Sequence, residues 1–110
     1  MTFVDYLAEK KSLMRTEEAE AKASQRQDEA VFARIRYNVY DVCETVYGAL
    51  KRAKGEDFPA AYEAKLRELE RAWSDAWDKA AQHSDPDRTF TEDVKLSALR
   101  DVLAHWEKEA

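Results

Sequence analysis

The stretch DEAVFARIRYNVYDVCETVYGALKRAK, residues 28–54, predicts a helix that carries the core of the protein. Its apolar side chains recur every three or four residues, as on a helix with one buried face. A second apolar row lies beside the first and widens the apolar arc to about half of the helix circumference. Such a wide arc predicts contact with two neighbouring helices. The two rows consist of Val31, Ile35, Val39, Val42, Val46 and Ala49, and of Phe32, Tyr40, Cys43, Tyr47 and Leu50.

Two more helices are predicted on the C-terminal side of this stretch. Gly55 stops the first helix, and an apolar stripe of helical period then covers residues 59–82. A proline among turn-forming residues predicts a loop over residues 83–91. The last helix follows over residues 91–109. Because the connections are short, the three helices predict an all-α fold, an antiparallel three-helix bundle over residues 28–110.

The N-terminal side of the chain predicts a long helical arm, residues 1–27. No proline and only one glycine, Gly48, occur between Thr2 and Lys54, so one helix could cover nearly half of the chain. The arm carries a small apolar face of its own, whereas residues 15–29 are polar nearly all round. At about 100° per residue, this face and the apolar face of residues 28–54 point the same way along an unbroken helix.

Three arrangements of this arm are open from the sequence. It extends beyond the bundle, is exchanged between subunits, or folds back as a fourth element. A break near Thr16 is an alternative to one continuous helix, because the Thr16 hydroxyl could cap a helix that begins with two glutamates. The polar spacer favours projection or exchange, since a buried seam rarely carries so many polar residues in succession.

These features predict a small helical protein-interaction or assembly module that acts through the apolar arm and a tyrosine-rich flank. Self-association as a homodimer is the favoured arrangement, with another protein as the second choice. An exposed aromatic side chain is a common anchor of a protein contact. The predicted interaction residues are Phe3, Val4, Leu7, Met14, Tyr37, Tyr40 and Tyr47.

A nucleic-acid-associated regulator is one alternative function. The chain has a local excess of positive charge that could contact phosphates. Its net charge of −5 argues against general attraction to nucleic acid, and cations at a helix C-terminus also complement the helix dipole. The basic residues in question are Arg34, Arg36, Lys51, Arg52 and Lys54.

An enzyme or metal protein is another alternative, with a site near His83, Asp85 and Asp87. Alternating oxygen donors in a loop can converge on a cation. In a calcium-binding loop that starts at Asp85, however, Phe90 replaces the required glycine and Leu96 replaces the final glutamate. We therefore predict an ordinary capped turn here, and neither a metal nor a cofactor.

The remaining composition sets broad limits. Cys43 is the only cysteine, so the chain cannot form an internal disulfide, and no base is indicated beside this thiol. No apolar stretch approaches the roughly 20 residues of a membrane-spanning helix. The N-terminus does not resemble a signal peptide, so we expect a cytoplasmic protein. No catalytic residue is predicted, although distant residues can converge in a fold and enzyme activity stays open.

Overall fold

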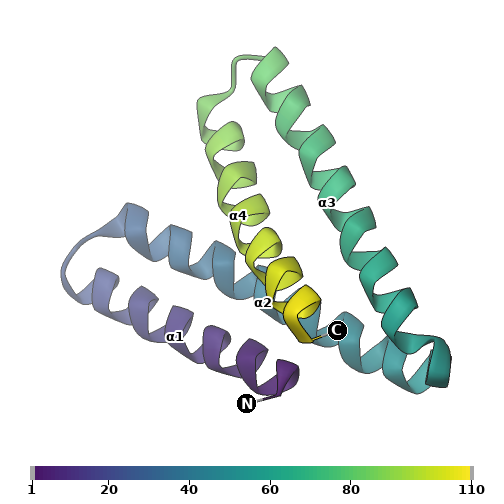
Figure 1. Cartoon of the computed structure of the whole chain (residues 1–110). Coiled ribbons are helices and arrows are strands. Elements are labelled where there is room, and N and C mark those ends of the chain that lie inside the picture. Colours follow the sequence, from purple (N-terminus) through teal and green to yellow (C-terminus); the bar gives the residue numbers. More distant parts are fainter. Residues whose placement is uncertain (1, 110) are drawn as a thin grey trace.

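The computed structural model describes residues 2–109, and helices make up nearly all of this range (Figure 1). No strand occurs within it, so the predicted all-α class is confirmed. One turn of 3₁₀ helix, η1 (Gly55–Asp57), connects the second helix to the third. The helices are α1 (Phe3–Ala23), α2 (Gln27–Lys54), α3 (Phe58–Gln82) and α4 (Pro86–Glu109).

A capping box fixes the first turn of α1. The Thr2 hydroxyl accepts a hydrogen bond from the Asp5 backbone N–H at 3.0 Å, and the Asp5 carboxylate accepts one from the Thr2 backbone N–H at 3.2 Å. These bonds satisfy donors that the start of a helix leaves free. The bond from the Thr2 backbone is the main reason that the pKa of Asp5 is lowered.

α1 runs through Thr16 without interruption, so the alternative of a break at this residue is wrong. The Thr16 hydroxyl donates a hydrogen bond to the Ser12 carbonyl one turn earlier, at 3.2 Å, and does not cap a new helix. Such back-bonding occurs within helices that continue.

The chain reverses direction at residues 24–26, in a Schellman turn. The Arg26 N–H donates to the Ala21 carbonyl at 2.7 Å, and the Gln25 N–H donates to the Lys22 carbonyl at 3.1 Å. Gln25 has a φ of 60°, the left-handed conformation that this turn requires and that glycine usually supplies. The sequence lacks a glycine here, which is why its pattern predicted one continuous helix.

α1 consequently folds back along α2 as a fourth element, which is one of the arrangements left open by the sequence, and it does not project from the bundle. The fold consists of two helical hairpins, α1 with α2 and α3 with α4, that pack against each other (Figure 1). α2 contacts the other three helices, whereas the predicted up-down-up bundle would have left α1 outside. Burial of the apolar face of α1 compensates for the left-handed residue in the turn.

The second hairpin closes with the same type of turn, in which Ser84 occupies the left-handed position. Ser84 has a φ of 52°, and the Asp85 N–H donates to the Ala80 carbonyl at 3.0 Å. α4 then begins at Pro86, not at Thr91, so the predicted loop over residues 83–91 is too long. Proline is well suited to the first position of a helix, because its fixed φ matches the helix and its missing N–H needs no partner.

Aromatic side chains of the core gather where the open ends of the two hairpins meet. Phe3 of α1 lies 5.0 Å from Trp106 of α4 and 5.8 Å from both Tyr47 of α2 and Tyr62 of α3, measured between ring centroids. The buried Tyr62 hydroxyl also donates a hydrogen bond to the Cys43 carbonyl at 2.8 Å. One aromatic side chain from each helix therefore locks the four helices together.

Candidate functional site

Most of the predicted interaction residues lie inside the protein. Phe3, Leu7, Met14 and Tyr40 are buried in the common core, where the other helices of the same chain cover them. Val4 is the exception on α1, since 38% of its surface stays exposed. The small apolar face that motivated the interaction hypothesis is thus covered within the chain.

The other two predicted tyrosines are half-buried and surrounded by cations. The Tyr37 ring lies under Arg15 and Lys11, at 4.7 Å and 5.4 Å from the ring centroid. The Arg15 guanidinium also donates a hydrogen bond to the Tyr37 hydroxyl. Tyr47 belongs to the aromatic cluster, and Lys51 lies over its ring. Both tyrosines therefore contribute to the packing of the helices.

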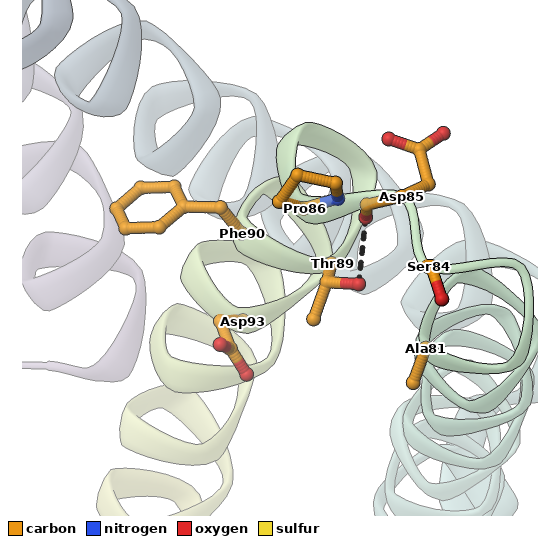
Figure 2. A pocket seen from close by; sticks show the side chains of 7 residues that line it. All are labelled: Ala81, Ser84, Asp85, Pro86, Thr89, Phe90 and Asp93. Atoms are coloured by element: carbon orange, nitrogen blue, oxygen red, sulfur yellow. Dashed lines mark hydrogen bonds between the residues drawn. The ribbon is translucent and has the colours of Figure 1, made fainter.

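The residues of the metal-protein alternative lie at the end of α3 and at the start of α4. The Asp85 carboxylate accepts a hydrogen bond from the Arg88 N–H at 3.1 Å, and its carbonyl accepts one from the Thr89 hydroxyl at 2.8 Å, drawn as a dashed line in Figure 2. No cluster of three or more His, Cys, Asp or Glu side chains that could hold a metal occurs within residues 2–109. Asp85 therefore caps α4, and His83 lies at the end of α3.

The five basic residues of the nucleic-acid hypothesis divide into two groups along α2. Arg34 and Arg36 lie near its N-terminal end, whereas Lys51, Arg52 and Lys54 lie in its last turn. At a rise of 1.5 Å per residue, about 25 Å of helix separates the groups. The exposed cations therefore do not gather into one patch.

Cys43 is fully buried beside the Tyr62 hydrogen bond. Burial raises the pKa of its thiol to about 12 because a thiolate would lose its hydration. A thiol that stays protonated is a poor nucleophile. Cys43 therefore acts as a small apolar core residue.

The most exposed large apolar side chain in the described range is Phe90, on the first turns of α4. Its surface is 46% exposed, and its ring lies 4.5 Å from the ring of Phe32 on α2. Figure 2 shows Phe90 pointing away from Ala81 of α3 and from Ser84 of the turn, beside an open recess of about 500 Å³ at the hairpin turn. The contact with Phe32 connects this tip of the second hairpin to the first hairpin.

An open apolar groove of about 390 Å³ lies next along the same two helices. Val42 in its wall is 38% exposed, and Val31, one turn before Ile35, is 39% exposed. The groove and the Phe32–Phe90 pair together are called the α2–α4 face below. The groove is lined by Ile35, Asn38, Val39, Val42, Trp73, Thr91 and Lys95.

Positive charge borders the α2–α4 face. Arg34 follows Val31 by three positions, so it adjoins the exposed apolar row beside the groove. Arg52 follows Ala49 by three positions on the same side of α2, about 15 Å along the helix beyond Val42. Within residues 2–109, neither arginine belongs to an ion pair; the α2 carboxylates Asp41 and Glu44 pair instead with Lys11 of α1.

Across the groove, Lys95 of α4 is held in place by its neighbours. Its ammonium lies 4.6 Å from the centroid of the Trp73 ring and 3.3 Å from the Glu92 carboxylate. Glu92 is almost fully buried, and its Oε2 lacks a well-oriented hydrogen bond within residues 2–109. The charge of Lys95 is therefore largely balanced. Arg34 carries the positive charge beside the groove, and Arg52 continues it toward the end of α2.

No known protein family, curated protein or solved structure matches this chain. Among residues 2–109, no helix is both long enough and apolar enough to cross a bilayer.

Helical periodicity did not reveal this face, because it predicts Val31, Ile35 and Val42 as core residues. The one sequence signal of this face is the width of the apolar arc on residues 28–54, because that arc is wider than a single hairpin partner can cover. In the structure, α3 and α4 cover part of that arc and leave the row through Val31 and Val42 at the surface.

Proposed function

We propose that this protein is a helical interaction module that holds an amphipathic helix of a partner protein on the α2–α4 face. The observation that carries the proposal is the exposed Phe90 ring, packed on Phe32 at the end of an open apolar groove. Exposed aromatic side chains beside a groove supply much of the energy of many protein contacts. An amphipathic helix lying in such a groove is a common mode of peptide recognition.

The charge around the groove favours one chemical class of partner helix. Arg34 and Arg52 are 18 residues apart, which is five helical turns, and both lie beside the apolar row. A partner helix with glutamates or aspartates along one flank would place carboxylates near these two guanidinium groups. Charge of complementary sign increases the rate of association and fixes the orientation of the bound helix.

The test uses two designed peptides with the same leucine and phenylalanine face. One peptide has glutamates along its flank, and the other has lysines. We expect the glutamate peptide to bind in fluorescence anisotropy and to shift the backbone NMR signals of Val31, Val42 and Phe90. Val42→Asp should abolish binding because it places a charge in the apolar groove.

Leu13→Asp is the matched control, because Leu13 is also an exposed apolar residue, 45% exposed, but lies on α1. It should leave the affinity for the glutamate peptide unchanged. The proposal fails if neither peptide binds at about 1 mM, which corresponds to only about 4 kcal/mol of binding free energy. It also fails if Val42→Asp and Leu13→Asp weaken binding equally.

A further inference from the structure

The two hairpin turns share one geometry but differ in the residue that follows them. Gln25 and Ser84 occupy the left-handed position of each Schellman turn, and Arg26 and Asp85 follow them. The next residue is Gln27 in the first turn and Pro86 in the second. Proline inside a helix removes a hydrogen bond and collides with the preceding turn, so the second turn cannot straighten into a helix.

The first turn has no such block. No glycine or proline occurs between Thr2 and Tyr47, and residues 17–28 are rich in glutamate, alanine, lysine, glutamine and arginine, which favour helices. The closed turn also contains a strained residue, since a left-handed glutamine is unfavourable compared with a glycine. Arg26 supplies no side-chain cap to α2. A straight helix over residues 3–54, about 78 Å long, relieves both features.

A single straightened copy would lose the contacts that bury α1. In the closed chain, the Phe3 ring contacts Trp106, and the Lys11 ammonium lies 2.8 Å from the Asp41 carboxylate. A straightened copy would lose both contacts. It would also lose the stacking of Tyr6 on His105, whose ring centroids are 3.8 Å apart in the closed chain. The core of an open copy is therefore incomplete, and α1 of a second open copy carries the matching side chains.

We propose that two copies of this chain exchange α1 by straightening residues 24–26, so that α1 of each copy packs on α2 and α4 of the other. Every contact of α1 is then remade between copies, and only the turn changes. Short, strained connections favour such exchange, and a symmetric dimer is its usual product. This inference does not depend on the α2–α4 face.

The test compares three variants by sedimentation and light scattering, after refolding at low and at high protein concentration. Gln27→Pro copies the second turn: the closed hairpin accepts it, because Gln27 is the first residue of α2, but a straight helix does not. It should abolish the dimer. Gln25→Gly removes the strain of the closed turn. It should therefore lower the association constant of the dimer about tenfold for each of the two turns that straighten.

The third variant replaces Ser24, Gln25 and Arg26 with alanine, which favours the straight helix without changing its length. It should enrich the dimer, and adding Gln27→Pro to it should restore the monomer. Val42→Asp is the control, since it should change peptide binding but not the dimer population. The proposal is overturned if the wild type and the triple-alanine variant are monomers throughout, or if Gln27→Pro leaves the dimer population unchanged. Should the triple-alanine variant fail to fold, a comparison of the wild type and the single Gln27→Pro variant still decides between these outcomes.

Discussion

Gln25 and Ser84 occupy equivalent positions in the two hairpin turns, with φ angles of 60° and 52°. Each residue lies between two helices and adopts the left-handed conformation that closes a Schellman turn. Neither is a glycine or an asparagine, the residues that adopt this conformation most easily. The same local strain is therefore present at both turns of the protein.

Replacing either residue with glycine should stabilise the protein. Relief of the left-handed strain exceeds the extra chain entropy of glycine, so we expect Gln25→Gly and Ser84→Gly each to raise the free energy of unfolding by about 0.5–1 kcal/mol. Urea unfolding measures this change. Ala19→Gly, inside α1, is the control and should lower the same free energy by about 1 kcal/mol. A loss of stability in both turn variants would contradict the assignment of strain.

Trp77 offers a second test of stability. Its indole N–H is buried and lacks a hydrogen-bond partner within residues 2–109. An unsatisfied buried donor costs about 1–3 kcal/mol, so Trp77→Phe should be neutral or raise the free energy of unfolding by about 1 kcal/mol, despite the smaller ring. Chemical denaturation followed by circular dichroism provides the measurement. Trp106→Phe, in the aromatic cluster, should instead lower stability, and an equal loss in both variants would refute the explanation.

The thiol of Cys43 should be inert in the folded protein. It is fully buried and its pKa is raised, so a thiol reagent can reach it only after the helices open. We expect its reaction with a disulfide reagent to be slow and to accelerate with urea in step with unfolding. A Leu13→Cys variant, exposed on α1, should react at once at the new site. Rapid reaction of Cys43 in the native protein would contradict the described core.

Stability should fall at alkaline pH. Burial is the main cause that raises the pKa of Tyr40 to about 12, and it raises the pKa values of Tyr6 and Tyr62 as well. In the unfolded chain these phenols ionise near pH 10. Their raised pKa values therefore contribute stability that is fully present below about pH 10 and is lost as the pH rises toward 12.

Tyrosinate absorbance and urea unfolding over this pH range check the prediction. Three of the five tyrosines should ionise late, together with unfolding. Tyr40→Phe should reduce the pH dependence, since phenylalanine has no proton to lose. Ionisation of Tyr6, Tyr40 and Tyr62 near pH 10 in a protein that stays folded would contradict it.

The sequence predicted the helices better than their arrangement. Helical periodicity located the helix that is observed as Gln27–Lys54 to within one residue, and Gly55 marked its end correctly. The turn at Gln25 gave no signal because local propensity there favours a helix. Only the burial of Phe3, Leu7 and Met14 against the rest of the chain determines that the chain reverses.

The start of α4 was missed for a different reason. Pro86 was interpreted as part of a loop, although a proline that follows Asp85 also forms a good helix start. The α2–α4 face was beyond sequence reasoning, because the exposure of Phe90 and Val42 depends on how the second hairpin lies on the first.

The contact between Phe3 and Trp106 bears on how this protein is synthesised. A ribosome releases α1 long before it completes α4, so the nascent α1–α2 hairpin emerges with one side of Phe3 uncovered. The aromatic cluster can close only after translation has passed Trp106. Until α4 has left the ribosome, the growing chain therefore presents an adhesive α1 surface to chaperones or to neighbouring nascent chains.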